Sequence, residues 1–517
     1  MKSQIQFAVT LVFVATLTGI TAKTVVFYPL PLTSYIVYHS SLAGALASLG
    51  HDVWICVPAS LTAKHLIQDK SINTLVYGEY LGDIVKQLYE QTRIAETFWM
   101  NETFSTIKLI VDFSKTFVKV AEVVLADQIF VRKVRNLKPD LIVLESTILA
   151  PNMVVLPYML DIPFALVGTA HDPVQSKIPF SPATTPYCLF DISEKMTFFQ
   201  RLQMTLFYFV HMNFELFYDS SLVAKFAPHK PYKTISQLVT EAEIFIAEVD
   251  HILDYPRTVL PNTKLIGGSS TSPAKPLSGE FKKFVDESKN GVVVMSFGSS
   301  VTNVPSYIVS KIASAFRQLN QSVIWRINIV SPDPKQILTS TWVPQNDLLG
   351  HEKTKLFVSH CGKNGQYEAL YHGVPMLCLP IYADQPYNSE RVVVKHFGLR
   401  ADMRQASADE LAAIMKEIIY NKTYTENIQK ASRLYRELYK LPKQEAAYWL
   451  DHVMKYGGEY MRSPGQKMPW YQIMVLDVVV FIIAVIAVLI FLMMYFIVKL
   501  WRCVFTDGQR FVKRKRE

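Results

Sequence analysis

The sequence predicts an α/β protein with two doubly wound domains of parallel sheet and a C-terminal transmembrane helix. Three observations indicate this fold class. Short apolar runs alternate with helical patterns through two successive parts of the chain. Prolines and glycines accumulate at residues 256–282, as is typical of an interdomain linker. Near the C-terminus, Val478–Val498 is a run of 21 uncharged apolar residues, long enough for the roughly 30 Å hydrocarbon core of a bilayer.

Length and composition agree with this organisation. At 517 residues the chain is too long for a single hydrophobic core. Half of the residues are hydrophobic and 19% are charged, which is apolar for a soluble enzyme and indicates a membrane connection. The net charge of +9 does not favour a nucleic-acid partner, because seven basic residues lie in the last nineteen positions and the body is nearly balanced.

The two ends of the chain predict an anchored protein whose body faces a lumen. Residues 1–22 have the pattern of a secretory signal peptide, so we place the mature start at Lys23. A juxtamembrane segment, 461–477, precedes the transmembrane helix, 478–498, and a basic tail, 499–517, follows it. Because basic residues stay on the cytosolic side, a single-pass type I orientation is expected.

The tail favours the endoplasmic reticulum. Lys513 and Lys515 lie fifth and third from the end, which resembles a dilysine retrieval signal; a basic flank that only stops membrane transfer is the alternative. Three Asn-X-Ser/Thr motifs, at Asn101, Asn320 and Asn421, are potential glycosylation sites on the lumenal side.

The five cysteines are few and scattered. They show neither the spacing of a metal site nor a dense disulfide framework. Cys56 and Cys378 fall inside apolar strand patterns, so we expect both of them simply to be buried.

The first domain is assigned to residues 23–262. Its opening strand, helix and strand form a unit in which the two strands pair in parallel through a right-handed crossover. The expected elements are strand Thr24–Leu30, a helix through Leu49 that Gly50 ends, strand Val53–Val57, helices through 80–135, and strands Leu141–Glu145 and Phe164–Gly168. The aromatic-rich helix Met196–Tyr218 either packs in the core or lies in a membrane interface, and both alternatives remain open.

The second domain is assigned to residues 263–460. Its expected elements are strand Gly291–Phe297, helix Tyr307–Leu319, strand Ser322–Ile327, strands Lys355–Val358 and Pro375–Pro380 with helix Gln366–Tyr371 between them, and a helix that begins with the capping box Ser407–Glu410. The small-residue turn 360–365 before helix Gln366–Tyr371 can hold an anion on backbone N–H groups. Polar side chains crowd the same strand ends, where open α/β sheets bind ligands. They are Gln345, Ser359, His360, Glu368, Asp384 and Gln385.

These residues resemble the signature of the UDP-glycosyltransferases, a family that includes the animal UDP-glucuronosyltransferases. The matching positions are Trp342-x-Pro344-Gln345, His360-Cys361-Gly362-x-Asn364, Glu368, Gly373-x-Pro375 and Asp384-Gln385. The resemblance covers essentially the whole chain and is closest to the membrane-bound animal branch, although that branch usually has glycine at Cys361. It implies a GT-B fold of two facing Rossmann-like domains, in which the C-terminal domain binds the donor and the N-terminal domain holds most of the acceptor.

The resemblance also implies roles for the matching residues. Trp342 would stack on uracil, and Gln345 and Glu368 would bind ribose hydroxyls. The diphosphate would lie on Ser299, His360 and the amides of Gly362–Asn364, and these groups would stabilise the departing UDP. Asp384 and Gln385 would bind the sugar. UDP-glucuronate or UDP-glucose would be a co-substrate, and neither a cofactor nor a metal is expected.

The catalytic base departs from the family pattern. Counting back from Gly50-His51, the family's histidine falls on Tyr35, and its acidic partner falls on Glu145. A tyrosine, with a pKa near 10, is a poor base at neutral pH. His39 lies one helical turn beyond Tyr35, shares its face, and is the alternative base. Without a base, family members still act on nucleophilic acceptors such as amines or ionised phenols.

The sequence therefore predicts a lumenal UDP-glycosyltransferase that glycosylates a small lipophilic acceptor with inversion. The alternative, favoured by Tyr35, is a catalytically silent member that binds UDP-sugar or lipophiles, or regulates active relatives by oligomerising. Assembly into homo- or hetero-oligomers stays open, as do the sugar and the acceptor. No arginine dedicated to a sugar carboxylate is identified.

Overall fold

The computed structural model describes residues 22–79, 106–148, 150–179, 181–213, 217–298 and 304–514. They form one compact unit through Arg462 and a second from Ser463 onward, and each unit is described by itself. Several features predicted from the sequence lie outside the described residues. These are nearly all of the signal peptide, the helices expected at 80–105, Asn101, Ser299 and the last three residues of the tail.

Seven parallel strands form the first sheet of the described chain, in the order β3-β2-β1-β4-β5-β6-β7. They are β1 (Thr24–Tyr28), β2 (Asp52–Pro58), β3 (Ile72–Tyr77), β4 (Leu141–Glu145), β5 (Phe164–Gly168), β6 (Phe245–Ala247) and β7 (Thr263–Leu265). Alternate residues of β1 point to opposite faces, so that Val25 and Phe27 enter one core cluster and Val26 and Tyr28 another. Both faces are therefore covered, as parallel sheets require.

Helices supply this cover. They are α2 (Thr33–Ala47), α5 (Thr106–Ala126), α6 (Gln128–Leu137), α7 (Val155–Leu160), α8 (Phe198–Asn213), α9 (Ser221–Phe226) and α10 (Ile235–Val239), with short 3-10 turns at Ala59–Lys64 and Pro151–Val154. Helix α2 ends because the chain turns at Gly50, whose φ of +92° suits glycine. Its buried face includes His39, which therefore points toward the sheet and away from solvent.

The second sheet of the described chain has six parallel strands, in the order β10-β9-β8-β11-β12-β13. They are β8 (Val292–Ser296), β9 (Ser322–Arg326), β10 (Ile337–Ser340), β11 (Thr354–Ser359), β12 (Met376–Cys378) and β13 (Gly398–Arg400). The helices are α11 (Gly279–Glu287), α12 (Ser306–Arg317), α13 (Gln345–Leu349), α14 (Lys363–His372), α15 (Gln385–Val394), α16 (Ala408–Tyr420) and α17 (Lys422–Leu438). The predicted capping box is confirmed, since Ser407 and Glu410 cap the start of α16 reciprocally.

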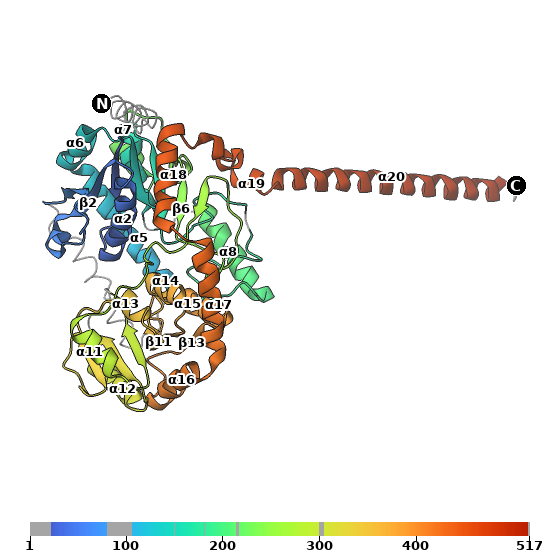
Figure 1. Cartoon of the computed structure of the whole chain (residues 1–517). Coiled ribbons are helices and arrows are strands. Elements are labelled where there is room, and N and C mark those ends of the chain that lie inside the picture. The colour runs from blue at the N-terminus through green and yellow to red at the C-terminus, as the bar shows by residue number, and fades with distance from the viewer. Residues whose placement is uncertain are drawn as a thin grey trace, which may run out of the picture. The chain divides into compact units, whose positions relative to one another are not determined.

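The predicted domain boundary needs two corrections. Strand β7 begins at residue 263 yet pairs with β6 in the first sheet. Helix α18 (Pro442–Tyr456) also returns to the first domain, where Ala446 and Leu450 share a core cluster with Val25 of β1 and Ile36 of α2. Figure 1 shows α18 beside α2 although the two are about four hundred residues apart in sequence. The apolar stripe of α18 completes a face of the first sheet that the first 262 residues leave uncovered.

Helix α8 combines features of both alternatives that the sequence left open. Met204 and Tyr208 are buried in the core of the first domain, as in a core helix. Phe198, Phe199 and Leu206 on the other side are 57 to 76% exposed, as in a helix that lies against a membrane.

The second unit contains short turns at Pro464–Lys467 and α19 (Trp470–Ile473), followed by the long helix α20 (Leu476–Arg514). Within α20, Leu476–Cys503 is long and apolar enough to cross a membrane, and it contains the predicted span 478–498. None of that span is buried inside the protein, so it is not a core helix of either domain.

Candidate active site

His360 lies at the carboxyl end of β11, where the strand order of the second sheet reverses between β8 and β11. Such a reversal places ligands at the strand ends. Two glycines make room for the imidazole. A Cβ at Gly362 would lie 2.4 Å from His360 Nε2, and a Cβ at Gly298, whose φ is +69°, would lie 3.0 Å from Cε1. A side chain at either position would displace the ring.

The charge state of His360 limits what it can do. Burial, followed by the nearby charge of Arg326, lowers the pKa of His360 to about 4. The imidazole is therefore neutral near pH 7, with one N–H to donate and one nitrogen to accept. It can hydrogen-bond a phosphate oxygen but cannot neutralise its charge, and that role falls to cations and to helix α14.

Helix α14 presents an uncapped N-terminus at the same place. Gly362 is its N-cap residue and supplies no side chain, and no other side chain of the described residues caps the first turn. The backbone N–H groups of the first turn, including that of Asn364, have no acceptor within the helix. Together with the helix dipole they form an anion site.

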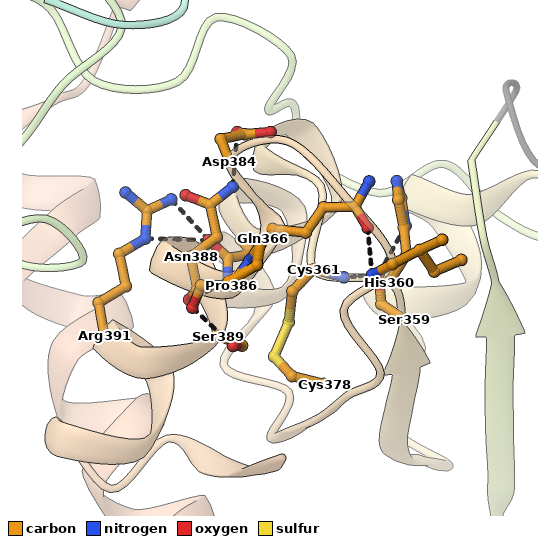
Figure 2. Close-up of a disulfide and its surroundings, with 12 residues drawn as sticks. Ser359, His360, Cys361, Gln366, Cys378, Asp384, Pro386, Asn388, Ser389 and Arg391 are labelled. Carbon is orange, nitrogen blue, oxygen red and sulfur yellow. Dashed lines mark hydrogen bonds between the residues drawn. A yellow bond between two sulfur atoms is a disulfide. The ribbon is translucent and has the colours of Figure 1, made fainter. Parts of the chain in front are cut away.

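A disulfide holds this turn. Cys361, in the left-handed region with φ of +60°, is bonded to Cys378, and their Cα atoms lie 5.3 Å apart. Figure 2 shows the bond running from the turn beside His360 to Cys378 at the end of the neighbouring strand. The expectation for Cys378 was incomplete, because the residue is buried but also bonded. Pairing of β11 with β12, rather than sequence spacing, brings the two sulfurs together.

Of the three residues predicted for a nucleoside site, Trp342 and Gln345 are close in sequence, and Gln345 contacts Glu368. The Trp342 side chain is 63% exposed, so its ring face is open to a ligand. Gln345 Nε2 donates a hydrogen bond of 2.5 Å to Glu368 Oε2, which joins the start of α13 to α14. Burial, with the charge of Asp347 adding to it, raises the pKa of Glu368 to about 7.

Asp384 and Gln385 begin helix α15. Asn388 Nδ2 donates to Asp384 Oδ2 at 2.7 Å, which orients the carboxylate and leaves its other oxygen for a ligand. Gln385 is buried, and its side-chain oxygen accepts from the backbone N–H groups of Ile381 and Tyr382. Only its amide nitrogen is left to donate, so Gln385 braces the loop and is not able to accept from a sugar through that oxygen.

The sequence did not single out Lys363, although it lies inside the quoted motif. Its Nζ donates a hydrogen bond to the backbone oxygen of Thr169, the residue after β5 of the first sheet. Burial lowers the pKa of Lys363 to about 8, more than the attraction of Asp254 raises it. The resemblance alone gave no signal for this residue because the motif leaves the position open.

A buried ionic cluster that the sequence did not reveal fixes the linker to the donor elements. Asp254 pairs with Arg257 at 2.9 Å and with Arg391 of α15 at 3.3 Å, and it accepts from the Tyr387 hydroxyl at 2.5 Å. Arg391 also donates to Gln366 of α14 at 3.0 Å. These two arginines hold the pKa of Asp254 well below its usual range despite burial.

In the first domain, the structure brings His39 and Glu145 together. His39 Nε2 lies 3.0 Å from Glu145 Oε2, and both side chains are buried, with at most 1% exposed. Glu145 Oε1 accepts from the backbone N–H groups of Ser146 and Thr147 at 3.1 Å. Burial raises the pKa of Glu145, against the opposing effect of His39. His39 therefore contacts Glu145, the residue predicted to be the acidic partner of the family's catalytic histidine. Both side chains are buried, so His39 is not exposed at the surface.

Tyr35 lies one turn before His39 on α2. It is partly buried and packs against the small cluster formed by Leu30, Phe117 and Ala150. The candidate proton-accepting residues are thus arranged in depth along one helix face, with Tyr35 nearer the surface and the His39–Glu145 pair beneath. In the described parts of the chain, no three His, Cys, Asp or Glu residues gather in a group that would hold a metal ion.

Comparison with known proteins places this arrangement in a family. Residues 25–511 match the family described as UDP-glucoronosyl and UDP-glucosyl transferase. UDP-glucuronosyltransferase 2B17 of Homo sapiens is 30% identical over 469 residues, 86% of this chain and 87% of that protein. UDP-glucuronosyltransferase 2B1 of Rattus norvegicus is 30% identical over 476 residues, 87% of this chain and 88% of that protein.

Solved structures share the fold at low identity. The glycosyltransferase VinC in complex with dTDP has a TM-score of 0.59 and 18% identity, over 84% of this chain and all of that one. A UDP-glucosyltransferase from Polygonum tinctorium that glucosylates indoxyl has a TM-score of 0.56 and 16% identity, over 85% of this chain and all of that one. The two parallel sheets are therefore those of a GT-B fold. The chain belongs to the UDP-glucuronosyl and UDP-glucosyl transferase family and is a glycosyltransferase that uses UDP-sugars.

Proposed function

We propose that the chain transfers a glucuronosyl or glucosyl group from a UDP-sugar to a small lipophilic acceptor, with inversion. One observation carries the proposal. His360, the uncapped N-terminus of α14 and the Gln345–Glu368 pair converge on the strand ends where a nucleotide diphosphate would lie. Trp342 would stack on the uracil, and Glu368 would accept from ribose hydroxyls.

The donor groups act mainly on the leaving group. As the acceptor attacks the anomeric carbon, the bond from that carbon to the β-phosphate oxygen breaks and UDP leaves with an added negative charge. The amides of Gly362–Asn364, the N–H of His360 and the charge of Arg326 would stabilise that charge. Asp384 and the amide of Gln385 would hold the sugar hydroxyls.

The acceptor proton has two routes through this chain. Glu145 holds His39 by a buried hydrogen bond to Nε2, so we propose that an acceptor proton would reach His39 through a group nearer the surface. Tyr35, one helical turn before His39 on α2, is the candidate for that group. An acceptor that loses its proton readily, such as a phenol or an amine, needs no such relay. We therefore expect phenols and amines to be better acceptors than aliphatic alcohols, by a factor on the order of 10² or more when general-base catalysis is weak.

A small hollow in the first domain is lined by apolar and polar side chains from the segment after β5, from α8 and from the linker, among them His171, Ile178, Thr185, Tyr208 and Arg257. Its volume of about 20 Å³ holds roughly one water molecule, so the hollow is too small to be the acceptor site by itself.

We further propose an endoplasmic reticulum membrane location with the body in the lumen. The apolar helix Leu476–Cys503 and the basic residues that follow it support this orientation. Asn320 and Asn421 are exposed and available for glycosylation. Glycosidase treatment of the expressed protein should lower its mass. Protease added to intact membrane vesicles that enclose the lumen should cleave only the C-terminal tail.

A turnover assay tests the proposed activity. The full chain in membranes is incubated with UDP-glucuronate and UDP-glucose against phenol and amine acceptors, and the glycoside is measured. Binding of UDP without any transfer would leave the silent-member alternative. Tyr35→Phe and His39→Ala are then compared with the wild type, and wild-type rates in both would remove the two residues as proton acceptors.

A further inference from the structure

Three polar residues of α15 lie on one side of that helix. Asp384, Asn388 and Arg391 are spaced by four and three positions, so their side chains follow one another along a single helix face. Asn388 and Arg391 are buried, with at most 1% of either residue exposed. Figure 2 shows Gln366 of α14 beside this face. The face therefore joins the two helices whose first turns form the donor site.

Arg391 and Gln366 form the centre of this contact. Arg391 donates twice to Gln366 Oε1, from Nε at 3.0 Å and from Nη2 at 2.5 Å. Because the guanidinium group holds the amide oxygen, the amide NH2 group must point to the other side. There, Gln366 Nε2 donates to the backbone oxygen of Asn388 at 2.7 Å. Arg391 therefore fixes the orientation of the Gln366 amide, and through it the position of Asn388.

The network connects the two parts of the donor site. At one end, Asn388 Nδ2 donates to Asp384 Oδ2 at 2.7 Å, which orients the carboxylate predicted to hold the sugar. At the other end, Gln366 lies about one helical turn beyond the amides of Gly362–Asn364, which form the anion site. The hydrogen bonds of Arg391, Gln366 and Asn388 therefore set the spacing between the anion site and Asp384.

The need to neutralise Asp254 does not explain Arg391. Asp254 Oδ1 already accepts from Arg257 at 2.9 Å and from the Tyr387 hydroxyl at 2.5 Å. Arg391 Nη1 lies 3.3 Å from Asp254 Oδ2, an ion pair without a hydrogen bond in the described structure. The hydrogen bonds of Arg391 go instead to the neutral amide of Gln366. Since burial of a guanidinium group is costly and an apolar side chain would fill the same space, arginine at this position serves the geometry of Gln366.

We propose that Arg391 is a positioning residue for the transferred sugar, and that it acts through Gln366 and Asn388 to hold Asp384 at a fixed distance from the diphosphate site. The inference rests on the proposed function, in which Asp384 binds sugar hydroxyls, and it adds a buried residue that touches no substrate. Without Arg391 the Asp384 carboxylate loses its fixed position, whereas the α14 amides still bind the diphosphate. Loss of Arg391 therefore weakens binding of the sugar and spares binding of UDP.

Calorimetric titration of the full chain with UDP, UDP-glucose and UDP-glucuronate tests this inference. Arg391→Lys keeps a positive charge beside Asp254 but cannot donate two N–H groups to one oxygen in the same fixed geometry. Affinity for each UDP-sugar that the wild type binds should fall about 10-fold, and affinity for UDP should change less than about twofold, as for couplings within one hydrogen-bond network. Gln366→Met should give the same pattern. Arg257→Lys is the matched control, because Arg257 shares Asp254 without contacting Gln366, and it should keep the wild-type ratio of affinities.

A double variant shows whether Arg391 acts through Asp384. Asp384→Asn alone should weaken UDP-sugar binding, and adding Arg391→Lys to it should weaken that binding less than about twofold further. Fully additive losses would overturn the inference. So would an equal loss of affinity for UDP and UDP-sugar in Arg391→Lys, or the same selective loss in the control Arg257→Lys.

Transfer measured on the same preparations separates this inference from the proposed activity. The expected affinities without any transfer would support the role of Arg391 and contradict the activity. Transfer with wild-type affinities in Arg391→Lys and Gln366→Met would contradict the inference and leave the activity standing. Wild-type binding of UDP-sugars by Asp384→Asn would contradict the sugar role of Asp384 and, with it, the inference.

Discussion

The two domains follow the family pattern to different degrees. In the second domain, the turn 360–362 leads into the uncapped N-terminus of α14, and Gln345 hydrogen-bonds Glu368. In the first domain, the predicted position of the base holds Tyr35, and the histidine that meets Glu145 comes from one turn deeper in the fold. The donor site is therefore preorganised by backbone geometry and glycine placement, whereas the proton-transfer side depends on a single buried pair.

The difference follows from what each half must recognise. A nucleotide diphosphate is a fixed ligand, and a helix N-terminus beside a glycine turn binds it through backbone groups that tolerate few substitutions. Acceptors vary in acidity, so the residue that takes their proton is free to vary with them. We expect mutations in the donor half to abolish activity with every acceptor, and mutations around Tyr35 to act selectively.

The largest effect is predicted for His360→Ala. Loss of the hydrogen bond to the departing diphosphate should lower kcat by about 10²- to 10³-fold with any acceptor, as for other groups that stabilise a leaving charge. Steady-state kinetics with phenol and amine acceptors measures it. His229→Ala, at an exposed position, is the matched control. A loss restricted to one acceptor class would place His360 on the acceptor side instead.

Glu145→Gln should impair proton transfer in the first domain without affecting UDP binding in the second domain. The amide keeps the shape of the buried side chain but cannot hold His39 as a carboxylate does, so transfer to neutral hydroxyls should fall by about 10²-fold. Calorimetric titration should give an unchanged affinity for UDP. Weaker UDP binding in this variant would show that the first domain shapes the donor site as well.

Removal of the disulfide tests how firmly the donor turn is held. The bond closes a 17-residue separation, for which chain entropy predicts a loss of about 3 kcal/mol in the free energy of unfolding when Cys378 is replaced by Ala. In the double variant Cys361→Gly, Cys378→Ala, glycine suits the left-handed φ, so stability should recover in part. Denaturant unfolding with and without dithiothreitol measures both effects. Wild-type stability that does not respond to the reductant would contradict the prediction.

The smallest effect concerns pH. The pKa of Glu368 is raised to about 7, so the residue ionises between pH 6 and 8 and becomes a better acceptor for ribose hydroxyls as pH rises. Affinity for UDP should therefore increase several-fold across this range in the wild type and stay flat in Glu368→Gln.

The same shift has the opposite sign for stability. Because the folded pKa of Glu368 lies above its unfolded value, its contribution to stability is full in acid and is lost as pH rises through about 7. Melting temperatures at pH 6 and pH 8 should diverge less in Glu368→Gln than in the wild type. Parallel curves for the two proteins would contradict the shift.

The sequence by itself determined the two doubly wound domains, the apolar C-terminal helix and the donor motif. Strand periodicity, glycine turns and a long uncharged run are local properties that a single chain displays directly. Tyr35 and Glu145 were located by counting from a fixed motif. These features required no knowledge of distant contacts.

Tertiary structure decided what depends on distant segments meeting. Helix α18 completes the first domain, Cys361 bonds Cys378 across neighbouring strands, and His39 reaches Glu145 over 106 residues. Lys363 donates a hydrogen bond to Thr169, a contact that exists only because the fold places these distant residues side by side. Local propensity could not predict these contacts, because sheet order and packing, rather than neighbouring residues in the chain, determine which distant residues meet.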